Sequence, residues 1–155
     1  MKNLTRVLLG FFVSFCCLQS IAQELQKKLP VNEPDYHKPK LFADLPERID
    51  FNPTNFLNLF ELKVGDSANV PISSSFNFAG VVVSKSDNPG SSSVVIRSTN
   101  RLGARWIFTR VTDENNSTKY LGRIISFEHG DSYEIVSENN QYYFKKKGLY
   151  DLMNE

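Results

Sequence analysis

The chain has 155 residues, of which 41% are hydrophobic and 23% are charged, and its formal net charge at pH 7 is +1. This length and composition are those of one globular domain that can bury an ordinary hydrophobic core. A charge this close to zero argues against a nucleic-acid-binding protein, which would be expected to carry a strong basic excess.

Residues 1–22 have the composition of a cleavable signal peptide. Lys2 and Arg6 make the start positive, residues 7–18 are almost entirely apolar, and Ala22 is a small residue at the expected cleavage point. The apolar run is too short to span a bilayer, which takes about 20 residues. We therefore expect an exported protein, periplasmic or extracellular, with no transmembrane segment once the leader is removed.

Both cysteines, Cys16 and Cys17, fall inside this leader. The mature chain would then have no disulfide, no thiolate nucleophile and no cysteine ligand for a metal. Loss of Lys2 and Arg6 with the leader lowers the formal charge from +1 to −1. Stability is therefore expected to come from the hydrophobic core alone.

Residues 23–46 are polar and contain four prolines, each of which disfavours helix at the residue before it. We interpret this segment as an extended, proline-rich arm or linker. It is either disordered or lies along the domain with Leu41, Phe42 and Leu45 as anchors. Residues 47–155 are expected to form a single β-rich domain.

A short helix is expected near the start of that domain. Asn52 is a favourable N-cap, Pro53 suits the first helical position, and Phe51 can pack against Phe56 across the cap.

From residue 66 onward, β-branched and aromatic residues alternate with polar ones, and the connections are rich in turn-forming residues. Strands are expected at residues 68–72, 76–85, 93–99, 104–112, 119–128, 132–137 and 141–147. Both faces of the sheet carry apolar side chains. The predicted fold is therefore mainly β: an antiparallel meander curled into a small barrel or a two-layer sandwich, with the short helix packed on it.

The turn residues also predict how the last three strands pair. Asn139–Asn140 as a type I′ turn sets Ile135 opposite Phe144. A three-residue loop at 129–131 would set Ile125 opposite Ile135. These two registers place on one face, which we expect to be buried, the side chains of Ile125, Phe127, Tyr133, Ile135, Tyr142 and Phe144.

The connecting loops of two earlier hairpins also predict how their strands pair. A five-residue loop at 113–117 sets Phe108 opposite Gly122, where the ring can cover the missing side chain. The simplest register of the preceding hairpin sets Arg97 opposite Trp106, which would allow a cation–π contact.

A pattern of aromatic-x-Gly-x-aliphatic-aliphatic-Ser occurs twice, over residues 78–84 and 120–126. Two copies are too few for a repeat protein, so the pattern reflects either an old duplication or the reuse of similar strands in a meander. Gly80 and Gly122 are each expected at a bend or a close approach of two backbones.

The densest basic run is Lys145–Lys147, at the end of the last expected strand. Alternation distributes the three side chains over both faces of that strand. Charges on exposed strands commonly prevent edge-to-edge pairing, so we interpret the run as protection of a sheet edge rather than as a binding patch.

Known catalytic patterns are missing from the sequence. His37 and His129 are too far apart for a paired-histidine metal motif, and the chain contains neither a Gly-x-Ser-x-Gly elbow nor a phosphate-binding P-loop. The best polar cluster, His129–Ser132, fits a hairpin loop. We assign no catalytic, cofactor-binding or metal-ligating residue and expect no cofactor, which makes a non-enzyme the favoured interpretation.

Aromatic residues on the strands offer another route to function, because such rings can stack on sugars. The residues in suitable positions are Trp106, Tyr120, Tyr142 and Tyr143.

The order Phe78-x-Gly80-x-Val82, residues 92–96, Gly103, Gly122-Arg-Ile124 and Tyr133-Glu-Ile135 resembles the strands of propeptides of secreted zinc metalloproteases of the metzincin class, over residues 76–137. The chain departs from that family because it has no mature cysteine for a cysteine switch and no following protease domain with zinc-binding histidines. It also resembles small secreted β-domain proteins of Gram-negative bacteria. The resemblance implies binding without catalysis and carries over no functional residue.

Two functions are therefore kept open. The first is a secreted, non-catalytic binding domain, propeptide-like or inhibitor-like, that recognises an envelope or secreted protein, with a secreted protease as a candidate partner. The second is a glycan-binding module or small glycan-active enzyme, which is suggested by the aromatic content. The sequence does not indicate which residues would bind a partner.

Overall fold

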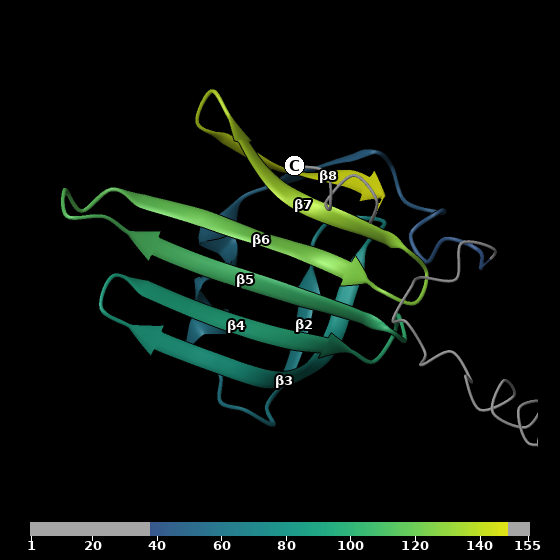
Figure 1. Cartoon of the computed structure of the whole chain (residues 1–155), viewed down its shortest axis with the longest axis horizontal. Coiled ribbons are helices and arrows are strands. Elements are labelled where there is room, and N and C mark those ends of the chain that lie inside the picture. Colours follow the sequence, from purple (N-terminus) through teal and green to yellow (C-terminus); the bar gives the residue numbers. More distant parts are fainter. Residues whose placement is uncertain (1–37, 149–155) are drawn as a thin grey trace, which may run out of the picture. The chain divides into compact units, whose positions relative to one another are not determined.

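The computed structural model describes residues 38–148, so the expected leader and most of the proline-rich arm lie outside the described part. Within this range the main element is an antiparallel sheet of eight strands, in the order β1-β8-β7-β6-β5-β4-β3-β2. Figure 1 shows that the sheet is strongly curled and forms a half-barrel. The prediction of a mainly β, antiparallel fold is confirmed.

The strands β2 to β8 form a continuous meander, and only β1 joins the sheet by a long-range pairing with β8. The elements are β1 (Arg48–Phe51), the 3₁₀ helix η1 (Pro53–Glu61), β2 (Ser67–Pro71), β3 (Asn77–Asn88), β4 (Ser91–Ser98), β5 (Ala104–Thr112), β6 (Thr118–Ser126), β7 (Asp131–Glu138) and β8 (Gln141–Gly148).

The helix begins as the sequence predicts. Asn52 is the N-cap and its side chain accepts a hydrogen bond from the backbone N–H of Thr54 at 3.2 Å, while Pro53 occupies the first helical position. The rings of Phe51 and Phe56 stack across the cap with their centroids 5.1 Å apart. The helix lies on the concave face of the sheet, and its buried side chains enter the core there.

Trp106 is at the centre of that core and is fully buried. Rings from β1, η1, β3 and β8 approach it edge-on, at centroid distances of 5.7 to 6.4 Å: Phe51, Phe56, Phe78 and Phe144. Edge-to-face packing of this kind adds to the stabilisation that comes from burying the rings.

The register of the last hairpin agrees with the prediction. Asn139 and Asn140 both have positive φ, at 50° and 63°, and Ile135 pairs with Phe144. Asparagine tolerates this backbone conformation, which a type I′ turn requires at both central positions.

The register predicted for β6 and β7 is wrong by three residues. Ile125 pairs with Ser132 rather than with Ile135, and it is Ile124 that faces Tyr133 and the core. The connecting loop has four residues rather than three, so Phe127 is not in the core and is 51% exposed. A shift by an odd number of residues moves every side chain of a strand to the other face, because successive side chains alternate between the two faces.

The register predicted for β4 and β5 is wrong as well, in this case by one residue. Arg97 pairs with Arg105, and Trp106 pairs with Ile96 on the concave face. Arg97 and Trp106 therefore lie on opposite faces, and the expected cation–π contact between them does not form.

Both glycines of the repeated pattern lie where two backbones approach closely. A Cβ atom on Gly122 would lie 2.2 Å from the carbonyl oxygen of Ile107, and one on Gly80 would lie 2.4 Å from the carbonyl oxygen of Arg97. Phe108 is opposite Gly122, as predicted. Any larger residue at these positions would push neighbouring strands apart.

The interpretation of Lys145–Lys147 as protection of a sheet edge is wrong, because β1 pairs with β8 along this stretch. Lys146 donates to the carbonyl oxygen of Leu45 at 2.5 Å, and Lys147 forms an ion pair with Glu134 at 2.9 Å. Two lysines of the run are thus part of the packing of the sheet.

Candidate binding site at the loop end of the sheet

The polar residues around His129 do not converge on one point. His129 Nδ1 lies 2.7 Å from Ser126 Oγ, and Ser132 Oγ donates to the carbonyl oxygen of Lys147. Asp131 Oδ2 accepts a hydrogen bond from the backbone N–H of Phe42 at 2.8 Å. Each side chain is thus engaged with a different part of the fold, and the cluster does not have the geometry of a catalytic site.

Within residues 38–148 no group of three or more histidine, cysteine, aspartate or glutamate side chains could hold a metal ion. Over the same range, no helix is long and apolar enough to cross a membrane.

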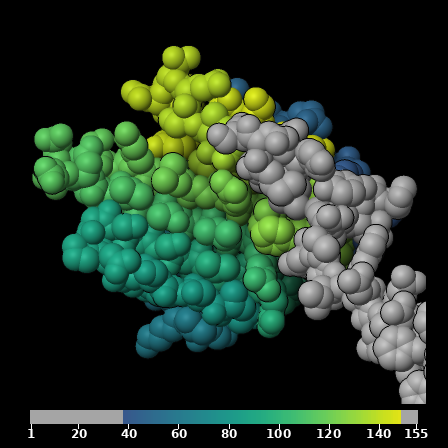
Figure 2. Space-filling view, viewed as in Figure 1, coloured from purple at the N-terminus to yellow at the C-terminus, as the bar shows by residue number. Residues whose placement is uncertain are grey.

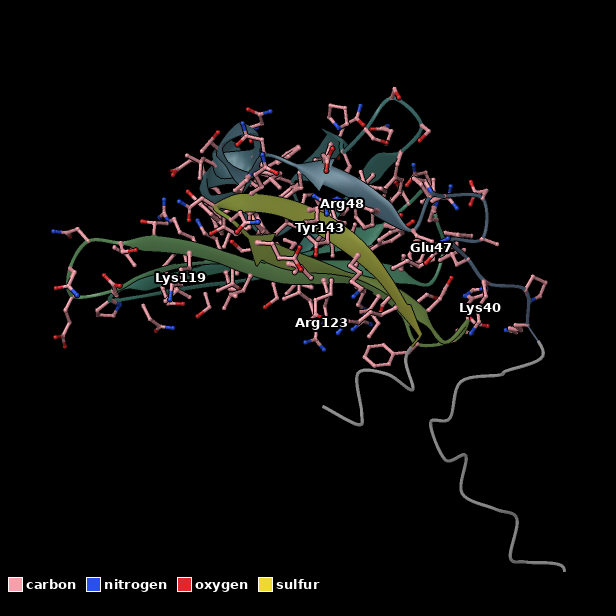
Figure 3. All side chains as sticks on the ribbon, turned by 90° about the horizontal axis from the view of Figure 1, so that it is seen from above. Lys40, Glu47, Arg48, Lys119, Arg123 and Tyr143 are labelled. Carbon is pink, nitrogen blue, oxygen red and sulfur yellow. The ribbon has the colours of Figure 1, made fainter. Side chains whose placement is uncertain are left out.

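The four aromatic residues considered for sugar stacking offer little free ring surface. Trp106 is fully buried, and Tyr120 stacks on Phe108 at 5.9 Å. The guanidinium carbon of Arg48 lies 3.7 Å from the ring centroid of Tyr143, which is itself buried (Figure 3). Tyr142 lines a surface depression together with residues of β1 and η1. These positions therefore do not form an aromatic platform for a sugar.

The two edges of the described sheet are poorly suited to adding a partner strand. β1 has only four residues, and its exposed side chains Arg48 and Asp50 form an ion pair at 3.2 Å. β2 ends with Pro71, which has no N–H group to donate. Short, charged or proline-containing edge strands discourage edge-to-edge pairing.

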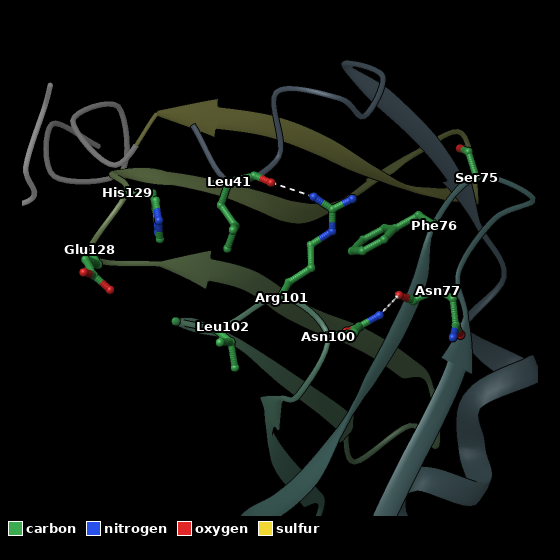
Figure 4. A pocket seen from close by; sticks show the side chains of 10 residues that line it. Leu41, Ser75, Phe76, Asn77, Asn100, Arg101, Leu102, Glu128 and His129 are labelled. Atoms are coloured by element: carbon green, nitrogen blue, oxygen red, sulfur yellow. Dashed lines mark hydrogen bonds between the residues drawn. The ribbon is translucent and has the colours of Figure 1, made fainter. Parts of the chain in front are cut away.

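A hollow of about 770 Å³ lies at the end of the sheet where three hairpin loops meet. Its walls are the β2–β3 loop, the β4–β5 loop, the β6–β7 loop and the segment 38–46 that leads into β1. Figure 4 shows that Leu41 and Phe76 contribute apolar surface, while Asn77, Asn100 and His129 contribute polar groups. The lining is therefore mixed, because three apolar side chains stand among six polar or charged ones: Ser75, Asn77, Asn100, Arg101, Glu128 and His129.

Arg101 holds one wall of this hollow in place. Its guanidinium forms two hydrogen bonds to the Asp44 carboxylate, at 2.8 and 2.6 Å. Figure 4 shows a third hydrogen bond, to the carbonyl oxygen of Leu41 at 2.6 Å. It also lies 5.5 Å from the ring centroid of Phe76. The hydrogen bonds from Arg101 hold the pKa of the Asp44 carboxyl below its usual value. A planar fork of this kind fixes both partners in orientation.

Asn100 holds the neighbouring wall. Its side-chain oxygen accepts from the backbone N–H of Ala79 at 3.1 Å, and its side-chain nitrogen donates to the carbonyl oxygen of Asn77 at 2.8 Å. The amide thereby links the β4–β5 loop to β3. Because both walls are held by hydrogen bonds, the hollow needs little reorganisation before it binds a ligand.

The β6–β7 loop is tied to the segment before β1. Lys40 Nζ donates to the carbonyl oxygens of His129 and Gly130, and Lys38 forms an ion pair with Glu128. Beneath this loop, burial raises the pKa of the Asp131 carboxyl, and its Oδ1 atom has no hydrogen-bond partner within the described residues.

Two large apolar side chains stand exposed on the loops beside the hollow. Leu102 in the β4–β5 loop is 74% exposed, and Phe127 in the β6–β7 loop is 51% exposed. The two loops are neighbours, because a Cβ atom on Gly103 would lie 3.5 Å from the Glu128 carboxylate. Exposed apolar residues that gather next to a depression are characteristic of contact surfaces for partners.

The fold and this site define a small β domain with a preformed depression at the loop end of a half-barrel. No protein-family model, curated protein or solved structure matches the chain. Sequence patterns did not single out Asn100, Arg101 or Leu102, because only the closing of the half-barrel brings their loop against residues 38–46.

Proposed function

We propose that this protein is an exported, non-catalytic binding domain that recognises an envelope or secreted protein through the loop end of its sheet. The observation that carries the proposal is the pair of exposed apolar side chains, Leu102 and Phe127, beside a hollow whose walls are already held by hydrogen bonds. A side chain of the partner would enter the hollow, and the two exposed residues would be covered around it.

A protein partner is favoured over a glycan by the chemistry of this surface. The exposed side chains of Leu102 and Phe127 offer apolar contact area beside the hollow. The aromatic residues suited to sugar stacking lie elsewhere and are mostly covered. Burial of apolar side chains around a central pocket is how protein partners gain most of their affinity. The resemblance to metalloprotease propeptides makes a secreted protease the first partner to test.

Export is the part of the proposal that depends on the sequence alone. The positive start, the short apolar run and Ala22 motivate cleavage before Gln23. Mass spectrometry of the native protein should find a chain that begins at Gln23, whereas a mature chain that begins at Met1 would rule out the leader.

The binding surface is tested by capture with the tagged mature chain and two matched variants. Leu102→Ser combined with Phe127→Ser removes the exposed apolar residues at the loop end without touching the core. Val64→Ser is the control, because Val64 is 62% exposed in the turn between η1 and β2, away from the hollow.

The proposal predicts that one protein is enriched from envelope extract or culture supernatant by the wild type and by the Val64 variant, but not by the double variant. All three proteins should have the same melting temperature. Equal capture by the double variant would exclude the loop end as the binding surface. A melting temperature raised by a soluble polysaccharide, with no protein enriched, would favour the glycan function instead.

A further inference from the structure

The outer, convex face of the sheet carries two arginines in direct opposition. Arg97 on β4 pairs with Arg105 on β5, and both side chains are exposed between buried neighbours of their strands. Like charges directly opposite each other in an antiparallel pair are destabilising. Within residues 38–148 neither guanidinium forms an ion pair with a carboxylate of the chain. Figure 2 shows the surface of the strands β3 to β6 from the side that faces away from η1.

The positive charge continues onto the neighbouring strands. Arg123 on β6 lies on the same face, directed away from η1 (Figure 3). It forms a long ion pair with Glu134, at 3.5 Å, and Glu134 is shared with Lys147 at 2.9 Å. One carboxylate therefore serves two cations, and it does not neutralise Arg97 or Arg105.

Aliphatic side chains lie next to these arginines. Val95 on β4 pairs with Ile107 on β5, both half-buried on the outer face, one row of the sheet away from the arginine pair. Leu121 on β6 belongs to the following row and is 54% exposed. Arginine is enriched in protein interfaces relative to the rest of a protein surface, and the neighbouring aliphatic side chains add apolar area that a partner can cover.

We propose that the outer face of β4, β5 and β6 binds an acidic segment of a protein partner. The guanidinium forks of Arg97 and Arg105 would pair with its carboxylates, which relieves their mutual repulsion, while Val95, Ile107 and Leu121 cover its apolar side chains. A protein segment is favoured over a polyanion because a sulfated glycan or nucleic acid would leave these aliphatic side chains without a partner. The near-zero net charge of the chain also provides no long-range attraction for a polyanion.

This surface is distinct from the hollow at the loop end, and its test is independent of the proposed function. The probe is a short fluorescent peptide in which glutamate and leucine alternate, and binding is followed by fluorescence anisotropy. One comparison peptide replaces glutamate by glutamine, and a second replaces leucine by serine.

The mature chain is compared with two double variants that lose the same charge. Arg97→Ser with Arg105→Ser removes the opposed pair. Lys63→Ser with Lys85→Ser is the control, since Lys63 lies in the turn before β2 and Lys85 on β3 pairs with the core residue Val94, which puts it on the concave side of the sheet.

The inference predicts binding of the acidic–apolar peptide that weakens at least about tenfold in the arginine double variant and stays close to wild type in the lysine double variant. Both comparison peptides should bind more weakly than the probe. The single variant Arg97→Ser should keep or raise the melting temperature, because it relieves a repulsion, and should still lose affinity.

Three results would overturn the inference. They are an absence of peptide binding by the wild type, an equal loss of affinity in both double variants, and binding of the serine peptide or of heparin as tight as that of the probe. The last result would identify a general polyanion surface. The loop-end variant, Leu102→Ser with Phe127→Ser, should bind the peptide normally, so that failure of one proposal does not decide the other.

Discussion

Replacement of Phe42 by alanine tests whether the segment before β1 belongs to the folded domain. The ring of Phe42 is fully buried, with centroids 5.6 Å from that of Tyr133 and 6.3 Å from that of Phe76. Loss of a fully buried phenylalanine costs about 3–5 kcal/mol of unfolding free energy. For a domain of this size that corresponds to a fall in melting temperature of roughly 10–25 °C.

Urea denaturation of the mature chain, followed by circular dichroism, measures this loss directly. Leu41→Ala is the matched control, since Leu41 is only partly buried at the margin of the core and should cost much less. A chain that begins at Glu47 should be strongly destabilised relative to the mature protein, because it lacks the buried side chains of Phe42 and Leu45. A loss below about 1 kcal/mol in Phe42→Ala would show that this segment is not part of the core.

Four further substitutions test particular features of the fold. Gly122→Ala should cost at least about 2 kcal/mol in urea denaturation, because its Cβ would lie 2.2 Å from the carbonyl oxygen of Ile107, and a neutral result would refute this close approach. Phe144→Asp should unfold the domain, since an unpaired buried charge costs several kcal/mol, and a folded circular dichroism spectrum would contradict that burial. His129→Ala should lower stability by no more than about 1 kcal/mol, the value of its hydrogen bond with Ser126 at the end of β6, and a larger loss would reveal a further structural role. Asp131→Asn should flatten the pH dependence of stability: burial raises the pKa of this carboxyl in the folded protein, so its contribution is fully present below the pKa of the unfolded chain and is lost as the pH rises through the folded pKa. Denaturation curves between about pH 4 and pH 7 measure how the free energy of unfolding changes with pH, and an equal change in the wild type and the variant would contradict the prediction.

The sequence determined those parts of the fold that depend on neighbouring residues. The Asn139–Asn140 turn specified its register because asparagine accepts positive φ. The loop at 113–117 specified the register of β5 and β6, because Asp113 accepts hydrogen bonds from the backbone N–H groups of Asn115 and Ser117. Helix capping by Asn52 is equally local. In each case the information lies within a few residues of the chain.

Tertiary structure alone decided the features that depend on distant residues. The β6–β7 hairpin is joined to the segment before β1 by a hydrogen bond from the backbone N–H of Phe42 to Asp131, 89 residues away. The β4–β5 loop is held by hydrogen bonds from Arg101 to the Asp44 carboxylate, 57 residues away. The pairing of β1 with β8 joins the two ends of the described domain. These contacts form only when the sheet curls, and a register that neighbouring residues leave ambiguous is then selected by the packing it permits. The loop-end hollow and the opposed arginines both result from that selection, which is why sequence patterns did not reveal either surface.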